Sequence, residues 1–391
     1  MRIAFIVSGL MICLTTCLSW PYACAEEGPT LDAAKFPDAV SQQVIFRQAV
    51  DGYNNIRIPA ICRANTGTLL AFAEGREAGD AGDINIILRR SADNGKTWAE
   101  PIVVWNDGTN TCGNPTPLVD RETGTIWLFC TWNVGTDHEK HIMDGTSSQP
   151  RKVFVCHSND DGVTWSQPVE QPQLRKSDWG WYATGPCNAI QLERGSHKGR
   201  LVVPANHSIV SEQLKGPQRY RSHLIFSDDH GKTWQLGALQ PELTNESTVV
   251  ELCDGSVMQN MRSYHGKGNR AVAVSRDGGE TFGDLYLDEA LVSPVCQASI
   301  LRYQWPENNE GRGVILFSAP HGKQRSQMTV WASQDDGKTW PHRKLIFDGS
   351  AAYSNLVALP EGRVGLLCEL GNDNPYRTIA FVTFPLSWLL K

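Results

Sequence analysis

One short motif occurs five times in the chain, and it constrains the fold more than any other feature of the sequence. Each copy reads Ser-x-Asp-x-Gly-x-Thr and ends in Trp or Phe; the copies begin at Ser91, Ser158, Ser227, Ser275 and Ser333. The starting points are therefore 67, 69, 48 and 58 residues apart. A unit that recurs at such spacings indicates a repeat architecture, in which similar units pack side by side.

The residues around each copy predict a β-hairpin. Runs such as "INIILRR", "KVFVCHS" and "MTVWAS" precede the motif, and their alternation or β-branched residues indicate strands. The Asp can accept backbone hydrogen bonds and the Gly can adopt a positive φ, as a tight turn requires. The aromatic residue is expected to fold back over its own hairpin. A calcium loop is the alternative, but strands flank the motif and no terminal Glu follows, so a structural turn is favoured.

Repeated hairpins of this size predict an all-β fold, a six-bladed β-propeller of four-stranded antiparallel blades. From residue 40 onward the chain is long enough for about six such units. The last unit lacks the motif, and we expect "YSNLVAL", "RVGLLCEL" and "TIAFVTFPL" to form it together with an early strand near "QQVIFRQ". Residues 43–391 are thus predicted to form a single propeller domain. A pair of β-sandwiches is the alternative, but it explains the even repeat less well.

The N-terminus differs from the rest of the chain. Residues 1–25 are interpreted as a secretory signal peptide and residues 26–42 as a lead-in to the propeller, because Arg2 precedes a long apolar run that ends in "ACA". The protein is therefore expected to be secreted or periplasmic. A lipoprotein anchor is the alternative, but the residues before Cys17 and Cys24 fit lipid attachment poorly. No later segment is long and apolar enough to span a membrane.

Charge and cysteine content argue against several classes of function. The formal net charge is −6 and no basic run is present, so nucleic acid is not expected as a partner. Of the 11 cysteines, three lie in residues 1–25, and the other eight are in a compartment that permits disulfides, with their pairing left open. No CxxC pair occurs, so zinc is not expected, and no cofactor or metal is predicted. Cys130 and Cys156 lie in apolar runs and are expected to be buried thiols.

If the turns are structural, the chemistry must come from other residues, and loops at one end of the strands are the usual place. Arg57 lies between apolar residues in "NNIRIPAI"; it either forms a buried ion pair or meets an anionic ligand, because an unpaired buried charge is costly. The Gly-rich loop after "LLAFAEGR" contains Asp80 and Asp83 and suits a general acid. Further polar residues near later strands are Glu246, Arg262, Arg325 and Tyr353. Each of these residues alone is more often an ordinary solvated residue than part of a site.

Taken together, these motifs resemble those of the exo-α-sialidases (neuraminidases). The resemblance rests on "RIP" at Arg57, on "NMRS" at Arg262, on the later Arg325 and Tyr353, and on the five turns, which resemble the Asp boxes of that family. It extends over about residues 43–388. It implies a six-bladed propeller whose site hydrolyses sialosides.

The resemblance also implies roles for individual residues. Three arginines would bind the carboxylate of sialic acid, namely Arg57, Arg262 and Arg325. Catalysis would involve Tyr353 as nucleophile, Glu246 as its base and Asp80 as acid/base, with Asp83 as the second choice. Supporting contacts would come from Arg76 to the sugar, from Glu369 to Arg57, and from Tyr182 at the rim beside Trp181.

Elementary chemistry agrees with these roles. Arginine is always charged and presents a planar fork that binds a carboxylate through two hydrogen bonds. The substrate carboxylate would repel an Asp or Glu nucleophile, whereas a neutral Tyr avoids this, and sialidases are a recognised exception to the two-carboxylate scheme. A Tyr needs an adjacent base, because its pKa is about 10. The sequence thus predicts a retaining exo-α-sialidase that acts on sialylated glycoproteins, gangliosides and oligosaccharides; a non-catalytic glycan-binding propeller and a trans-sialidase are the alternatives.

One stretch departs from the family pattern. "TGPCNAIQL" places Cys187, Asn188 and Ala189 where the family often has a Gly-Pro-Gly-His-Gly type stretch. We expect this change to alter the fine shape of the pocket on the aglycone side. The nucleophile, the base and the arginines are untouched, so activity is still expected. Linkage preference and oligomeric state are not indicated by the sequence.

Overall fold

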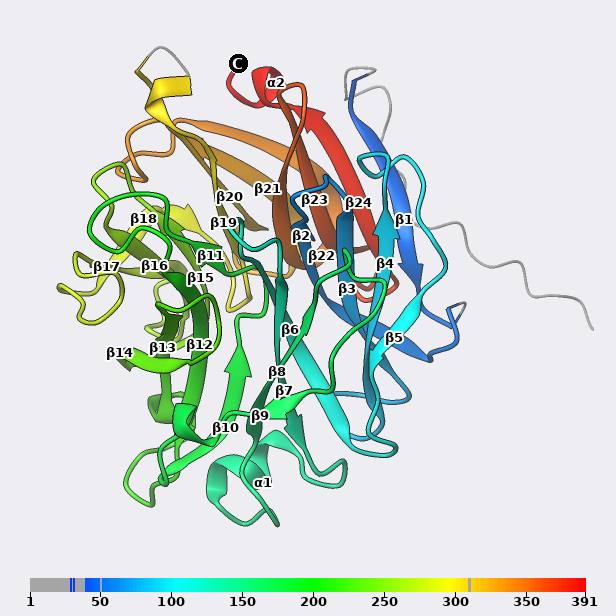
Figure 1. The fold of residues 1–391 in the computed structure, drawn as a ribbon, viewed down its shortest axis with the longest axis vertical. Coiled ribbons are helices and arrows are strands. Elements are labelled where there is room, and N and C mark those ends of the chain that lie inside the picture. The colour runs from blue at the N-terminus through cyan, green and yellow to red at the C-terminus, as the bar shows by residue number, and fades with distance from the viewer. Residues whose placement is uncertain (1–28, 30, 32–38, 50, 309–310) are drawn as a thin grey trace, which may run out of the picture.

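The computed structural model describes residues 29, 31, 39–49, 51–308 and 311–391, and this part of the chain is all-β with two short α-helices (Figure 1). The expected signal peptide, residues 1–25, lies outside the described residues, and so does most of the expected lead-in, whose last residues already belong to a strand that begins at Ser41. None of the helices in the described ranges has the length and apolar character needed to cross a membrane.

The strands form four hydrogen-bonded sheets. The first sheet comprises β2 (Asn55–Arg63), β3 (Leu69–Arg76), β4 (Ile84–Ser91), β5 (Ile102–Trp105), β6 (Thr111–Val119), β7 (Ile126–Asn133), β8 (Lys152–Ser158) and β9 (Val169–Glu170). The second comprises β10 (Trp179–Thr184), β11 (Ile190–Gln191), β12 (Leu201–Ile209), β13 (Tyr220–Ser227) and β14 (Gln235–Glu242). The third comprises β15 (Thr244–Glu251), β16 (Val257–Ser263), β17 (Asn269–Ser275) and β18 (Tyr286–Val292).

The fourth sheet joins the two ends of the chain. It comprises β1 (Ser41–Arg47), β19 (Ser299–Gln304), β20 (Val314–Pro320), β21 (Ser326–Ser333), β22 (His342–Leu359), β23 (Arg363–Gly371) and β24 (Thr378–Pro385). The helices are α1 (Glu139–Asp144) and α2 (Leu386–Leu389). Strand β1 pairs antiparallel with β24, and Figure 1 shows the blue β1 beside the red β24. The predicted pairing of the early strand with the C-terminal unit is therefore confirmed.

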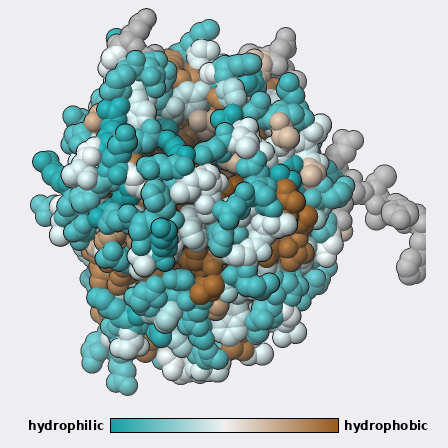
Figure 2. Space-filling view, viewed as in Figure 1, coloured by the Kyte–Doolittle hydropathy of each residue, from teal (hydrophilic) through white to brown (hydrophobic). Residues whose placement is uncertain are grey.

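Nearly all pairings are antiparallel and join strands that follow one another in the chain, which is the order of a propeller-type fold. The runs predicted to be strands before the motif correspond to β4, β8, β13, β17 and β21. Central strands are buried along their whole length, as in β3, because sheets pack against them on both faces. The face seen in Figure 2 is mainly hydrophilic with scattered apolar patches, so most large apolar side chains lie inside and between the sheets.

The five motifs are tight turns, as predicted, and the copy at Ser227 shows why each fixed residue is needed. The hydroxyl of Ser227 donates to Asp229 Oδ1 at 2.8 Å and accepts from the Gly231 N–H at 2.9 Å. Thr233 donates to Asp229 twice, from its N–H at 2.9 Å and from its hydroxyl at 2.7 Å. In the first copy the equivalent bonds from the Thr side chain and backbone lower the pKa of Asp93 to about 2. The motif carboxylates are therefore used to hold the turns.

The aromatic residue of the motif packs against a neighbouring part of the fold as well as against its own turn, where the Trp98 indole N–H donates to the Gly95 carbonyl at 3.2 Å. Trp234 lies edge-on to Phe129 of β7 with ring centroids 4.6 Å apart, and Trp98 lies edge-on to Phe381 of β24 at 5.4 Å. The turn glycine faces the same neighbour: a Cβ on Gly231, which has φ +82°, would lie 2.4 Å from the Trp127 ring. The motif therefore connects adjacent units as well as closing a hairpin.

The eight cysteines that follow residue 25 are free thiols. Seven of them are buried, among them Cys130 and Cys156, as the sequence predicted. Cys253 is the partly exposed member, and burial together with its hydrogen bond to Asp336 raises its pKa to about 11. A protonated thiol is a poor nucleophile, so these residues serve mainly as small apolar packing groups.

Candidate active site

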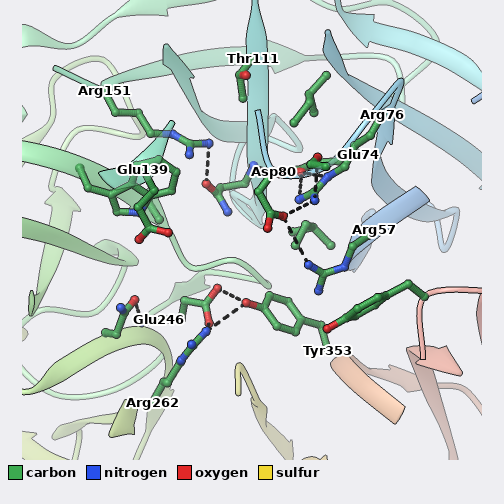
Figure 3. A pocket seen from close by; sticks show the side chains of 18 of the residues that line it. Arg57, Glu74, Arg76, Asp80, Thr111, Glu139, Arg151, Glu246, Arg262 and Tyr353 are labelled. Carbon is green, nitrogen blue, oxygen red and sulfur yellow. Dashed lines mark hydrogen bonds and ion pairs between the residues drawn. The ribbon is translucent and has the colours of Figure 1, made fainter. Parts of the chain in front are cut away.

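A cavity of about 340 Å³ collects residues from sequence positions 55 to 376. Seven of the predicted site residues line it: Arg57, Arg76, Asp80, Glu246, Arg262, Arg325 and Tyr353. All of these except Arg325 are labelled in Figure 3. They come from β2, β3, β15, β16, β22 and the loops next to β3 and β21. Two predicted residues lie outside the lining, namely Glu369, which is fully buried behind it, and Tyr182.

Irregular strand pairing turns side chains into the cavity. The register shifts between Arg57 and Ala60 in β2, and the intervening Ile58 has φ +63°. Similar shifts surround two of the catalytic candidates: Glu246 lies between Thr244 and Ser247 of β15, and Tyr353 lies between Ala351 and Ser354 of β22. A bulge bends a strand and redirects a side chain, and bulges are common next to functional sites. The fold thus departs from regular pairing where the pocket is formed.

Tyr353 and Glu246 form a buried hydrogen-bonded pair. The Tyr353 hydroxyl donates to Glu246 Oε1 at 2.5 Å, and Arg262 Nη1 donates to Glu246 Oε2 at 2.8 Å and to the Tyr353 oxygen at 3.3 Å. Burial, followed by the negative charge of Glu246, raises the pKa of Tyr353 well above its usual value, while Arg262, Arg57 and Arg325 act in the opposite direction. The phenol is therefore protonated in the empty pocket, with a base in hydrogen-bond contact.

Arg57 is held from behind by Glu369. Its Nε and Nη2 each donate to this carboxylate at 3.1 Å, and the same carboxylate accepts the N–H groups of Ile58 at 2.9 Å and Tyr353 at 3.0 Å. Burial lowers the pKa of Arg57, but the charge and hydrogen bonds of Glu369 together with Tyr353 and Tyr376 raise it overall. One buried acid therefore fixes both the arginine and the backbone of the adjacent tyrosine.

Asp80 lies at the mouth of the cavity, on the loop that follows β3. Its side chain is 79% exposed, and Oδ1 accepts a hydrogen bond from Arg76 and lies 3.7 Å from Arg57 Nη1. Partial burial raises the pKa of Asp80, but the guanidinium groups of Arg76, Arg57 and Arg151 outweigh it and lower the pKa overall. Asp83 does not line the cavity and instead accepts from Asn85 at 3.0 Å. The position of Asp80 therefore favours it over Asp83.

Arg76 and Arg325 both line the cavity and are held by hydrogen bonds within the protein. Arg76 is buried and donates from Nε to Glu74 Oε2 at 2.8 Å, in addition to its bond with Asp80. Arg325 donates to the Tyr376 hydroxyl at 2.7 Å and to the Val295 carbonyl at 3.2 Å. Both guanidinium groups are thus oriented before any ligand binds, which reduces the cost of ordering them in a complex.

The wall opposite Tyr353 contains polar residues that the sequence analysis did not identify. Arg151 is buried, lies 4.0 Å from the Trp181 ring centroid, and donates to Asn114 Oδ1 at 2.9 Å. Burial lowers the pKa of Arg151 to about 10. Glu139, at the start of α1, accepts from the Tyr220 hydroxyl at 2.5 Å. A single Arg in "QPRKVF" or Glu in "DHEKH" carries no signal of its own, because only the long-range topology brings them to the cavity.

Comparisons with known proteins agree with this geometry. A family model described as a BNR repeat-like domain matches residues 67–366. The chain is 34% identical over 375 residues to the exo-alpha-sialidase of Aspergillus fumigatus, covering 87% of this chain and 86% of that protein. The chain belongs to the exo-α-sialidase family of glycoside hydrolases.

Further relatives and solved structures support the same family assignment. The sialidase of Micromonospora viridifaciens is 38% identical over 357 residues, which are 87% of this chain but only 53% of that protein, so the chain spans about half its length. The structure of the Hadza microbial sialidase Hz136 has a TM-score of 0.78 at 30% identity and covers 89% of this chain and 69% of that one. An intramolecular trans-sialidase from Ruminococcus gnavus has a TM-score of 0.74 at 20% identity, covering 88% of this chain and 97% of that chain, and shows a shared fold.

The structure places Tyr182 in the core, so its expected place at the rim is wrong. Its side chain is fully buried, and its hydroxyl bonds to His223 Nε2 at 2.7 Å. The neighbouring Trp181 lines the cavity instead. The register of β10 shifts between Trp179 and Tyr182, which decides which of the adjacent aromatic residues faces the cavity.

The segment that departs from the sialidase pattern lies behind the cavity wall. Cys187, Asn188 and Ala189 are absent from the cavity lining, so their effect on the shape of the pocket stays a prediction and would be indirect. Asn188 Oδ1 accepts from Asn355 of β22 at 2.7 Å, and the Pro186 carbonyl accepts from Gln297 at 2.9 Å. The segment therefore connects β22 and the segment before β19 through hydrogen bonds beneath the site.

Proposed function

We propose that the protein is a retaining exo-α-sialidase, which hydrolyses terminal sialic acid from glycoproteins, glycolipids or oligosaccharides. The observation that carries this proposal is the Tyr353–Glu246 hydrogen bond of 2.5 Å, placed in a cavity lined by five arginines, among them Arg57, Arg262 and Arg325. Because the substrate bears a carboxylate on its anomeric carbon, those cations and a neutral nucleophile are matched to it.

The arginines Arg57, Arg262 and Arg325 are proposed to bind the substrate carboxylate. Arg57 presents its Nη1 toward the cavity, because its other nitrogens are engaged with Glu369. Arg262 uses Nη1 on Glu246 and keeps Nη2 for a ligand. Three cations in one cavity repel one another, and an anionic ligand relieves this repulsion. Arg76, on the Asp80 side, is proposed to contact the sugar hydroxyls.

In the first chemical step, the Tyr353 oxygen forms a bond to the anomeric carbon while the bond to the leaving oxygen breaks. The Tyr353 proton passes to Glu246, with which it is already hydrogen bonded. Asp80 gives its proton to the leaving oxygen as general acid. In the empty site its pKa is lowered by Arg76 and Arg57, and a bound carboxylate at Arg57 counters that effect and raises the pKa of Asp80.

In the second step, Asp80 takes a proton from water, which attacks the anomeric carbon and displaces Tyr353. The proton held by Glu246 returns to the tyrosine oxygen. Two successive displacements at one carbon restore its original configuration, so the product is the α-anomer. Nuclear magnetic resonance of the first product formed tests this assignment, since an inverting enzyme would release the β-anomer first.

We also propose that residues 43–391 form one domain whose ring closes as six four-stranded blades. The pairings of β22 support this: its first half pairs with β21 and its second half with β23, so it serves two blades. The partner of β24 is β1, which would complete the last blade. Removing residues 39–48 should therefore lower the midpoint of thermal unfolding.

We further propose secretion after cleavage of residues 1–25, which N-terminal sequencing of the mature protein tests.

Product analysis separates this function from its alternatives. The protein is incubated with α2,3-, α2,6- and α2,8-linked sialosides, with and without lactose, and the products are identified by mass spectrometry. Free sialic acid supports hydrolysis. A sialylated lactose product would indicate a trans-sialidase, and a product with an internal anhydro bond would indicate an intramolecular one. Binding without turnover would indicate a non-catalytic glycan-binding protein.

A further inference from the structure

Tyr376 touches two of the three arginines proposed to bind the substrate carboxylate. It lies between β23 and β24, is half-buried, and lines the cavity. The Arg57 guanidinium carbon lies 4.1 Å from its ring centroid, and Arg325 Nη1 donates to its hydroxyl at 2.7 Å. No motif in the sequence singled out this residue. Its contacts place a phenol at the same end of the cavity as the two cations.

The backbone around Tyr376 is fixed by a local turn. The Tyr376 N–H donates to Asn374 Oδ1 at 3.0 Å, and the Arg377 N–H donates to the Asn374 carbonyl at 3.3 Å. The phenol ring is held in addition by the face of the Arg57 guanidinium, a cation–π contact. The hydroxyl is therefore positioned before a ligand arrives.

The Tyr376 hydroxyl can donate a hydrogen bond to a ligand. A phenol can accept one hydrogen bond and donate another. Here it accepts from Arg325, and among the described residues no group accepts its own proton. The donors of the neighbouring arginines are partly used, since Arg57 spends two nitrogens on Glu369. A carboxylate has about four acceptor positions, which leaves room for a neutral donor beside the guanidinium groups.

We propose that Tyr376 is a fourth group that binds the substrate carboxylate, an inference that rests on the proposed sialidase function. Its hydroxyl donates to a carboxylate oxygen while accepting from Arg325, and its ring stays on Arg57. A neutral donor adds a directed hydrogen bond without adding to the repulsion among the cations. Tyr376 is thus a binding residue for the anionic group.

The test measures the affinity of 2-deoxy-2,3-didehydro-N-acetylneuraminic acid, an inhibitor with the same carboxylate, by calorimetry. Tyr376→Phe keeps the ring on Arg57 and removes only the hydroxyl, so we expect Kd to rise about tenfold. Tyr303→Phe is the matched control: that hydroxyl donates to the Arg363 carbonyl at 3.0 Å, outside the cavity, and its loss should leave Kd within about twofold.

A second pair of variants separates direct binding from positioning of Arg325. In an Arg325→Met background, followed by nuclear magnetic resonance titration at millimolar inhibitor, Tyr376→Phe should still raise Kd several-fold. If the effect disappears in that background, Tyr376 only positions Arg325 and the proposal is wrong. Equal affinities of wild type and Tyr376→Phe would also overturn it. Failure of the wild-type protein to bind this inhibitor or cleave sialosides would instead refute the proposed function.

Discussion

The cavity contains two tyrosine–glutamate pairs with the same hydrogen-bond length and different surroundings. In one pair Tyr353 donates to Glu246 at 2.5 Å, and in the other Tyr220 donates to Glu139 at 2.5 Å. Both tyrosines are buried, and burial raises the pKa of each. Hydrogen-bond geometry alone therefore does not distinguish a nucleophile from a structural or binding tyrosine.

The neighbouring charges make the difference. Arg262 bonds both members of the first pair, and three arginines act to lower the pKa of Tyr353. The second pair has the Met143 sulfur at 3.1 Å from the Tyr220 oxygen, and burial raises the pKa of Glu139 despite its bond from Tyr220. A phenolate forming at Tyr353 would thus be stabilised by three arginines, whereas at Tyr220 Arg262 is the one arginine among the main influences that acts in this direction. We propose chemistry for the first pair and sugar binding for the second.

The largest contrast is expected when each tyrosine is replaced by phenylalanine. Tyr353→Phe removes the nucleophile and should lower kcat at least about a thousandfold. Tyr220→Phe removes one hydrogen bond on the opposite wall and should raise KM by less than about tenfold, with kcat nearly unchanged. Steady-state kinetics on a fluorogenic sialoside measures both variants. Equal losses of kcat would abolish the distinction between the pairs.

Replacing the two glutamates should also reduce activity more in the first pair than in the second, but the contrast should be smaller than for the tyrosines. Glu246→Gln leaves Tyr353 without a base and should lower kcat roughly a hundredfold or more. Glu139→Gln keeps a hydrogen-bond acceptor for Tyr220 and should change kcat/KM only a few-fold. Kinetics on the same substrate, with circular dichroism as a check on folding, gives the comparison. A stronger effect at Glu139 would reverse our assignment.

Asp80, across from the first pair, should make ligand binding depend on pH. Its pKa is lowered in the empty site and raised by a bound carboxylate, so binding takes up a proton. The affinity for the didehydro inhibitor should therefore increase as the pH falls. The increase should lie between the pKa of Asp80 in the complex, which is the higher one, and its pKa in the free protein. Calorimetry at several pH values measures this. Asp80→Asn should remove the proton uptake, and its persistence in that variant would assign it to another group.

The smallest effect on chemistry is expected in the structural turns, whose carboxylates lie outside both pairs. Asp229→Ala removes the acceptor of bonds from Ser227 and Thr233 and should lower the free energy of unfolding by about 1–2 kcal/mol. At a temperature where the variant is folded, kcat/KM should stay within about twofold. Denaturant unfolding and kinetics test the two parts. A stable but inactive variant would show that the turn takes part in catalysis.

The local parts of the fold could be predicted from the sequence because their signals are local. The turn at Ser227 contains its own Ser, Asp, Gly and Thr partners within eight residues, and the flanking strands carry apolar patterns. The packing of Trp234 on Phe129 was not predictable, because the two residues meet only after separate sheets assemble. Local patterns therefore predicted the hairpins, but not how the hairpins contact one another.

The site divides in a similar way. Tyr353 and Arg57 lie in short motifs that resemble a known family, so the sequence indicated them. Glu139 and Tyr376 lie in stretches without a motif and reach the cavity through the long-range topology. Tyr182 was misplaced because a register shift in β10 decides which aromatic residue faces inward, and strand alternation alone does not reveal such a shift.

Covalent trapping tests the central claim most directly. A sialosyl fluoride with a second fluorine at C3 loses its C2 fluoride as the glycosyl-enzyme bond forms, and the C3 fluorine slows hydrolysis of that bond. The labelled protein can therefore be digested and the adduct located by mass spectrometry. We predict one adduct, on the Tyr353 oxygen, and none in Tyr353→Phe. The account would be contradicted by an adduct on Tyr220. It would also be contradicted if the wild type hydrolysed the reagent without forming a covalent adduct.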